Sequence, residues 1–331
     1  MPLLTPSQVH VDQPLTNLTL AYAQSQEAFI ADKVFPLVGV DKQSDKYYKY
    51  DRDNMNRTGD VKVLAPRTEV NRIGLALSED NYYADVYGLG MDFDEQTLAN
   101  EDAALDIRSA GAQTLANRLM IHREEQFAST FFSAGVWTSQ DLQSGRSIVE
   151  WDQATATPIK NVTDASKTIQ LQSGGFRPNT MVVGREVHDA LINSSDILKR
   201  IGLEAGATTA SPAMATRQMM ARIFEVENYY VMEAVKNTSA EGVAESNSFI
   251  GGKHAMLCYT PSNAGLMTPA SGLTFAWNNI PGVNNLGISV ESFSDDALKR
   301  QQIAEMIQVK MSYDMKVVGA DLGYFFETII A

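Results

Sequence analysis

The pattern of apolar and polar positions divides the chain into an irregular N-terminal part and a more regular remainder. Residues 22–60 show no sustained helical period, although they are rich in aromatic and aliphatic side chains. An extended segment cannot bury that much apolar surface by itself, and exposing it to water is unfavourable. The pattern therefore predicts that the rest of this chain, or another copy of it, covers these side chains. They are Phe29, Ile30, Val34, Phe35, Tyr47, Tyr48 and Tyr50.

The first 78 residues are predicted to form an arm followed by a long β-hairpin. Residues 1–44 form the arm, because four prolines interrupt regular structure there. Residues 45–78 form the hairpin, with a β-rich run at 46–51 and turn chemistry at 54–59. Rough alternation over 61–77 predicts the returning strand.

An apolar stripe with helical spacing predicts one long helix at about 101–134. Asp94 or Asn100 is the expected N-terminal cap, and Gly135 is the expected end. Such a helix is roughly 50 Å long at 1.5 Å per residue, so we expect it to lie across a domain as a spine. The stripe consists of Leu98, Leu105, Ala112, Leu115 and Leu119.

The rest of the chain has the mixed pattern of an α/β domain followed by returning strands. Alternation is clearest near the C-terminus, where Ile307, Val309, Met311 and Tyr313 are apolar at every second position. Helices are expected from 165–171 onward, at 185–200 and at 214–226, and strands at 180–184, 229–235, 255–259, 286–293 and 304–326.

Charge distinguishes the hairpin from the rest of the molecule. The 331 residues carry a net charge of −13, which argues against an autonomous sequence-reading DNA-binding protein without excluding weak contact with nucleic acid. Residues 42–72 contain eight basic and five acidic side chains, a charge of +3 against −16 for the remainder. A basic hairpin on an acidic body is suited to lie across a neighbouring copy, although a solvated hairpin is the alternative. The candidate intersubunit contacts are Phe29, Phe35, Lys46, Lys49, Arg52, Arg57, Lys62 and Arg67.

Residues that usually perform catalysis or bind cofactors and metals are not grouped in the sequence. No histidine lies three or four residues from another, and Cys258, the only cysteine, is expected to be packed in a strand. Glu124 and Glu125 diverge by about 100° on a helix, so we expect both to be exposed rather than paired. We therefore predict no catalytic, cofactor-binding or metal site, and no enzyme. Without a secretion signal or an apolar run of about 18 residues, we also predict a soluble protein with no membrane contact.

The order of these parts resembles that of tailed-bacteriophage major capsid proteins with the Hong Kong 97 fold. The resemblance covers nearly the whole chain, and several segments together carry it. They are Phe-Ile-Ala-Asp-Lys-Val-Phe-Pro at 29–36, Val-Asp-Lys-Gln-Ser-Asp-Lys at 40–46, Gly-Phe-Arg-Pro-Asn-Thr-Met-Val-Val-Gly at 175–184, Phe-Glu-Val-Glu-Asn-Tyr-Tyr-Val at 224–231 and Gly-Tyr-Phe-Phe-Glu-Thr-Ile-Ile at 323–330.

The resemblance implies an α+β fold with four parts. Residues 1–44 would be the N-terminal arm and 45–78 the extended loop that overlaps an adjacent subunit. Residues 79–147 with 288–331 would form the peripheral domain, and 148–287 the axial domain around fivefold and sixfold axes. Because Met1 lies almost at the arm, we expect any scaffold or maturation protease to be a separate protein, or to be absent.

By the same resemblance, the chain would build the icosahedral or prolate shell around the double-stranded DNA of a tailed phage. Its partners would be copies of itself in pentamers and hexamers, a portal, a separate scaffolding protein, a possible decoration protein, and packaged DNA in weak, non-specific contact. It would be assembled in the host cytoplasm and reside in the virion, without a cofactor. Two alternatives stay open: an encapsulin-type nanocompartment shell protein, and a soluble acidic hydrolase from a different class.

Overall fold

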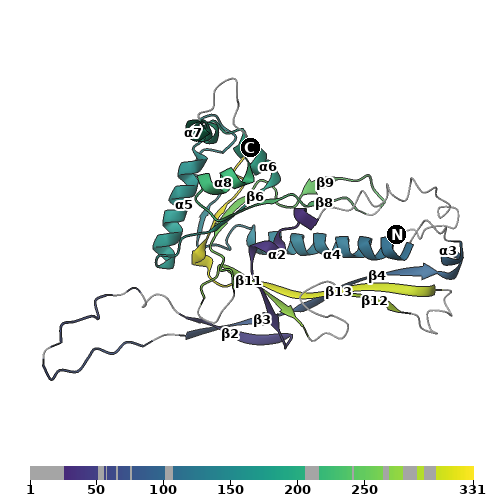
Figure 1. The fold of residues 1–331 in the computed structure, drawn as a ribbon, viewed down its shortest axis with the longest axis horizontal. Helices are drawn as coiled ribbons and strands as arrows, with labels where there is room; N and C mark the ends of the chain where they lie inside the picture. The colour runs from purple at the N-terminus through teal and green to yellow at the C-terminus, as the bar shows by residue number, and fades with distance from the viewer. Residues whose placement is uncertain are drawn as a thin grey trace.

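A long helix above a sheet forms the lower part of the molecule (Figure 1). Helix α4 (Ile107–Phe131) is the predicted spine, and its 25 residues span roughly 37 Å. It ends where the indole N–H of Trp137 donates to the carbonyl of Phe131 at 2.8 Å. The computed structural model describes residues 26–50, 56, 58–64, 66–74, 77–100, 107–205, 216–240, 242–263, 268–278, 289–293 and 303–331.

The apolar stripe of the spine faces the core, as the sequence predicts. Leu115 and Leu119 are buried, and Leu98 and Ala112 pack against the same cluster. Leu105 lies outside the described residues, as does the predicted start of the helix at 101–106.

Asp94 caps a separate short helix, α3 (Glu95–Ala99), so the prediction that it caps the spine is wrong. Its Oδ1 accepts the backbone N–H of Thr97 at 2.5 Å, and its Oδ2 accepts the Thr97 hydroxyl at 2.7 Å. Asn100 closes the same helix by donating its side-chain amide to the carbonyl of Gln96.

Strand β13 (Ile303–Val317) is the centre of the sheet beneath the spine. Its predicted alternation is confirmed, since Ile307, Val309, Met311 and Tyr313 are all buried on the face toward the core. The order is β1 (Leu37–Val40), β11 (Gly272–Trp277), β13, β12 (Ser289–Phe293), with β4 (Asp85–Asp94) also paired to β13. Strand β13 pairs antiparallel with β11, β12 and β4, and β1 pairs in parallel with the outer side of β11.

A second five-stranded sheet forms the core of the upper part of the molecule (Figure 1). Its central strands are completely buried, which explains their near-continuous apolar sequences. The predicted strands at 180–184 and 255–259 are confirmed here, to within one residue. The order is β5 (Ser139–Asp141), β14 (Gly323–Phe326), β10 (Ala255–Cys258), β6 (Thr180–Gly184), β7 (Asn228–Met232).

Four helices cover one face of this second sheet, and the end of α4 covers the other. Alternate strand residues explain the division: Val183 and Leu257 join the helices in one cluster, whereas Val182 and Met256 join Phe131 of α4 in the other. The predicted helix at 185–200 is two helices, since the chain turns at Asn193. The four are α5 (Pro158–Ser173), α6 (Arg185–Ile192), α7 (Ser195–Ala205) and α8 (Arg217–Ile223).

Two antiparallel strand pairs and three short helical turns complete the described structure. Strands β2 (Ser44–Tyr50) and β3 (Leu77–Tyr83) pair below the first sheet, and β8 (Val235–Asn237) and β9 (Asn247–Phe249) form the other pair. The short turns are Gln26–Ala28, α2 (Ala31–Val34) and Ala320–Leu322.

Three strands lie in a different part of the molecule from the one expected from the sequence. Strand β11, expected in the axial part, belongs to the lower sheet, whereas β5 and β14, expected in the peripheral part, belong to the upper sheet. The expected strand at 304–326 therefore divides into β13 and β14, which lie in different sheets. The chain thus crosses between the two parts more often than sequence order suggests.

Candidate assembly surfaces

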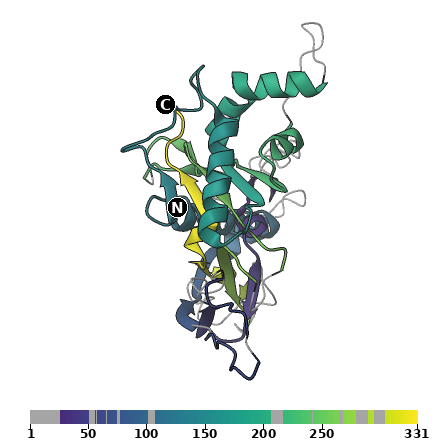
Figure 2. The ribbon, with the colours of Figure 1, turned by 90° about the vertical axis from the view of Figure 1, so that its left-hand side faces the viewer.

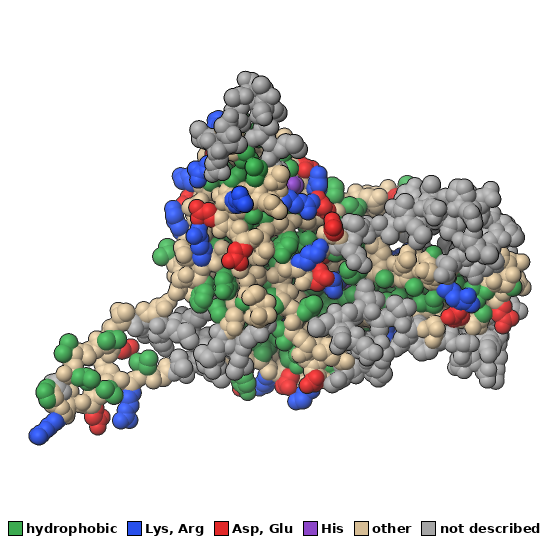
Figure 3. Space-filling model, in the orientation of Figure 1, with side chains coloured by type: hydrophobic (Ala, Val, Ile, Leu, Met, Phe, Trp, Pro, Cys, Tyr) green, Lys and Arg blue, Asp and Glu red, His purple; other side chains and the backbone are tan. Residues whose placement is uncertain are grey.

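The extended loop between β2 and β3 projects from one end of the molecule (Figures 1 and 3). Its described residues, 58–64 and 66–74, contain no strand, so the predicted returning strand at 61–77 is wrong and β3 starts at Leu77. Five aliphatic side chains of this loop are exposed to solvent. They are Val61 (83%), Val63 (100%), Leu64 (54%), Val70 (59%) and Ile73 (74%).

These five residues are functional candidates that the sequence analysis missed. Their alternation predicted a paired strand, whereas the structure exposes their side chains on a loop. A run of aliphatic side chains on a projecting loop cannot be covered by the loop itself, and such patches mark interaction sites. One feature of the sequence could have identified them. They lie between the turn residues and the start of β3, and no strand of comparable length precedes the turn to pair with them. The loop is therefore suited to bind another protein surface.

The predicted basic contacts are distributed over the loop and its base. Lys62 and Arg67 are exposed in the loop, and Arg67 has a φ of 70°. Lys46 instead forms an exposed ion pair with Glu79 of β3 at 2.6 Å, across the base of the hairpin. Lys49 lies in β2, but its side chain is not described, and Arg52 and Arg57 lie outside the described residues.

Aromatic contacts fix the base of the loop to the lower sheet. The rings of Tyr47 and Tyr82 lie 5.2 and 4.6 Å from that of Phe275 in β11. The Tyr47 hydroxyl donates to Asp80 at 3.0 Å, and burial, followed by this bond, raises the pKa of Tyr47. The backbone N–H of Tyr83 donates to Asp314 of β13 at 2.9 Å. The loop therefore projects from a fixed base.

Phe29 and Phe35 lie in the core of their own chain, so their prediction as intersubunit contacts is not supported. Both are at most 2% exposed. The Phe35 ring centre lies 4.4 Å from that of Phe131 and 5.7 Å from that of Phe127, both in α4. The spine helix thus supplies the cover that residues 22–60 require, at least for the segment 29–35.

Glu124 holds the same segment from the spine, which contradicts the expectation that it is exposed. Its buried carboxylate accepts the backbone N–H groups of Ile30, at 3.2 Å to each oxygen, and of Ala31, at 3.0 Å. Burial raises the pKa of Glu124 to about 7. Next to it, Arg123 pairs with Asp32 at 3.2 Å. The bonds to Glu124 satisfy two of the free N–H groups at the start of α2, those of Ile30 and Ala31.

Arg146 holds the C-terminal segment in a similar way, through an ion pair and backbone hydrogen bonds. Its side chain is 8% exposed and pairs with Asp141, which is 5% exposed, at 3.0 Å. The same guanidinium donates to the carbonyl of Thr328 at 2.8 Å and to that of Glu327. The C-terminal segment after β14 is therefore tied to the start of the second sheet.

Two histidines and the cysteine have structural roles in the described residues. His188 bonds the Tyr229 hydroxyl at 2.9 Å, and His254 accepts the backbone N–H of Thr328 at 2.9 Å. Cys258 is buried in β10, and burial raises the pKa of its thiol to about 12. No group of three metal-binding side chains occurs among the described residues. Within the same residues, no helix is long and apolar enough to cross a membrane.

Comparison with known proteins finds phage capsid proteins along almost the whole chain. A family model described as phage major capsid protein E matches residues 148–270. The chain is 24% identical to the major capsid protein of Pseudomonas phage JBD67, over 97% of each chain. It is 23% identical to the major capsid protein of Burkholderia phage BcepMu, over 96% of each.

Solved structures agree in fold at lower identity. A phage-related protein from Bordetella bronchiseptica RB50 matches with a TM-score of 0.66 at 19% identity, over 96% of this chain and 97% of that one. A chain from the capsid of cyanophage P-SCSP1u matches with a TM-score of 0.59 at 11% identity, over 92% and 89%. An encapsulin from Synechococcus elongatus PCC 7942 matches with a TM-score of 0.51 at 9% identity, over 95% and 94%. The resemblance to tailed-phage major capsid proteins is thus confirmed, and the chain has the α+β Hong Kong 97 fold.

Proposed function

We propose that this chain is the major capsid protein that self-assembles into the shell around the genome of a tailed phage. The observation that carries the proposal is the projecting loop, whose five aliphatic side chains are exposed while its base is fixed to the fold. The full-length similarity to two phage major capsid proteins supports it.

In this proposal the loop lies over an adjacent copy, and its aliphatic side chains are buried there. Lys62 and Arg67 would then meet the acidic surface of a chain whose net charge is −13. A contact of this kind is modest for one pair of subunits, but a closed shell repeats it many times. The expected partners are other copies of the chain in pentamers and hexamers, a portal, a scaffolding protein, a decoration protein and weakly held DNA. The chain is expected to assemble in the host cytoplasm and to reside in the virion.

The four-part organisation is proposed in a revised form. Residues 1–44 are the arm and 45–78 the extended loop. The peripheral part is built on α4 and β13 and includes β11, and the axial part is built on the second sheet and includes β5 and β14. The arm segment at 29–35 belongs to the peripheral part, because its side chains lie in that core.

Substitution of Val63 by Asp tests the proposal. Because Val63 is completely exposed, the isolated subunit should keep its fold, as circular dichroism and the urea midpoint would show. Burial of a carboxylate in the contact between subunits should abolish shells in electron micrographs. Thr58→Asp, an acidic substitution at an exposed polar position of the same loop, is the matched control and should assemble. Wild-type shell yield from the Val63 variant would contradict the proposal.

An encapsulin also matches the fold of this chain, so the fold does not distinguish it from a phage capsid protein. The contents of the particle do distinguish the two. Particles isolated from infected cells should contain nuclease-protected double-stranded DNA. Particles filled with a folded enzyme and free of DNA would indicate a nanocompartment instead.

A further inference from the structure

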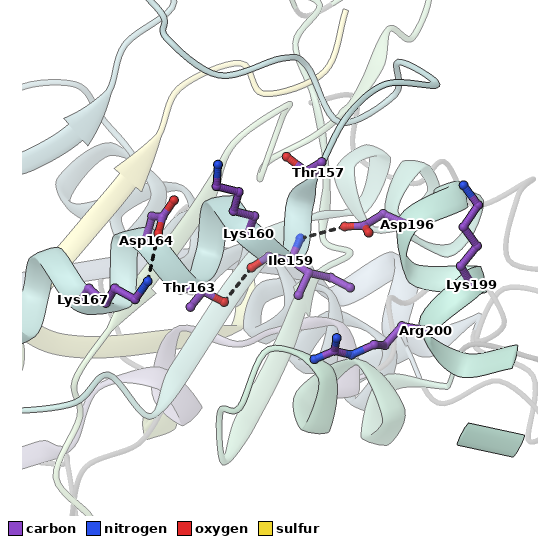
Figure 4. A pocket seen from close by; sticks show the side chains of 9 residues that line it. All are labelled: Thr157, Ile159, Lys160, Thr163, Asp164, Lys167, Asp196, Lys199 and Arg200. Atoms are coloured by element: carbon purple, nitrogen blue, oxygen red, sulfur yellow. Dashed lines mark hydrogen bonds and ion pairs between the residues drawn. The ribbon is translucent and has the colours of Figure 1, made fainter. Parts of the chain in front are cut away.

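A groove between α5 and α7 forms a second candidate surface, far along the chain from the extended loop. Helix α7 lies beside the N-terminal end of α5 (Figures 2 and 4). There the backbone N–H of Ile159 donates to Asp196 at 3.4 Å. The cavity between them has a volume of about 460 Å³. Its lining residues are Thr157, Ile159, Lys160, Thr163, Asp164, Lys167, Asp196, Lys199 and Arg200.

The groove is basic on a chain that is acidic overall. Four of its side chains are cationic and two are anionic, whereas the whole chain carries −13. Asp164 already pairs with Lys167 at 3.3 Å. Lys160, Lys199 and Arg200 are exposed and make no ion pair within the described part of the chain, and Arg200 extends from α7 toward α5 (Figure 4). The lining residues of the groove therefore keep a net positive charge.

An acidic counterpart lies on another helix of the same part of the molecule. Helix α6 exposes Glu186 and Asp189. Asp189 pairs with Arg185 of the same helix at 3.1 Å, whereas Glu186 has no ion pair within the described residues. Helix α6 packs on β6 and β7 at one end of the second sheet, whereas α5 packs on β5, β14 and β10 at the other end. Copies related by rotation around an axis join one side of a subunit to the opposite side of the next.

We propose that the groove between α5 and α7 binds the acidic face of α6 in a second copy of the chain. This inference rests on the proposed function, and it names a contact within a ring of subunits that is separate from the extended loop. Partly exposed ion pairs contribute little each, but they select the orientation in which two copies meet and raise the rate at which they associate. The contact should therefore weaken as salt is added.

A charge-swap cycle tests the contact. Arg200→Glu and Glu186→Arg should each lower the initial rate of shell assembly at least tenfold at low salt, while the isolated subunits keep the wild-type circular dichroism spectrum. The variant carrying both changes should recover at least half of the lost rate, because the reversed charges attract again. Arg222→Glu, at an exposed arginine of α8, is the matched control and should assemble at the wild-type rate.

Several results would overturn the proposed contact between the groove and α6. Wild-type rates from both single variants, absence of recovery in the combined variant, or an equal loss in the Arg222 control would overturn it. So would normal shells of the Arg200 variant with reduced DNA retention, since the groove would then face nucleic acid. Those results leave the proposed function standing if the wild-type chain forms shells, whereas failure of the wild type to form them contradicts the proposed function itself.

Discussion

Replacing Glu124 by Gln should remove a pH-dependent part of the subunit's stability. The carboxyl group has an ordinary pKa of 4.5 and one of about 7 when buried in the fold. The folded chain therefore keeps the proton to higher pH than the unfolded chain does. The resulting contribution to the free energy of unfolding is complete below about pH 4.5 and is lost as the pH rises through about 7.

The magnitude follows from the two pKa values of Glu124. Between pH 5.5 and pH 8 the contribution falls by about 2 kcal/mol, since one pKa unit corresponds to about 1.4 kcal/mol. Gln keeps the shape of the side chain and an oxygen that accepts from Ile30 and Ala31, but it does not titrate in this range.

Urea unfolding, followed by tryptophan fluorescence, measures the effect in subunits prevented from assembling by Val63→Asp. The stability of the chain that retains Glu124 minus that of the Glu124→Gln variant should fall by about 2 kcal/mol from pH 5.5 to pH 8. Glu125→Gln makes the same chemical change at a half-exposed site, so its difference should vary by less than about 0.5 kcal/mol. A Glu124 difference that stays constant or rises with pH would contradict this prediction, because it would mean that folding does not raise the pKa of the carboxyl group.

Two further predictions concern the core and the C-terminus. Leu115→Ala should lower the free energy of unfolding by about 2–5 kcal/mol because Leu115 is 2% exposed, whereas Leu171→Ala, at 85% exposure, should change it by less than about 0.5 kcal/mol in the same urea titration. Equal effects would contradict the assignment of the core. Arg146→Met should cost about 3–5 kcal/mol and speed hydrogen exchange at 327–331, since it leaves Asp141 buried without its partner. Arg177→Met, at an exposed ion pair, should cost at most about 1 kcal/mol, and slow exchange at 327–331 in the Arg146 variant would disprove the tie.

The periodic spacing of apolar residues predicted the helix and the strand that bury one face. The spacing of Leu115 and Leu119 gave the spine, and the alternation from Ile307 to Tyr313 gave β13, because a helix and a strand each repeat their buried positions at a fixed interval. The strand at 180–184 was equally clear, since both of its faces are buried.

Pairings between distant segments could not be predicted in the same way. Nothing near Glu124 in sequence shows that its partners are the N–H groups of Ile30 and Ala31, 94 and 93 residues away. The apolar surface of Phe35 was known to need cover, but only the fold shows that its own chain supplies it. The alternation at 61–77 suggested a strand, yet a strand forms only where a partner lies beside it, and the described residues 58–64 and 66–74 have none.

The proposed contact of the extended loop is tested most directly by a cryo-electron microscopy map of the wild-type particle. We expect a closed shell of pentamers and hexamers in which Val61, Val63 and Ile73 are buried against an adjacent copy. Small oligomers under every condition would contradict it, and so would a shell in which these three side chains stay exposed to solvent.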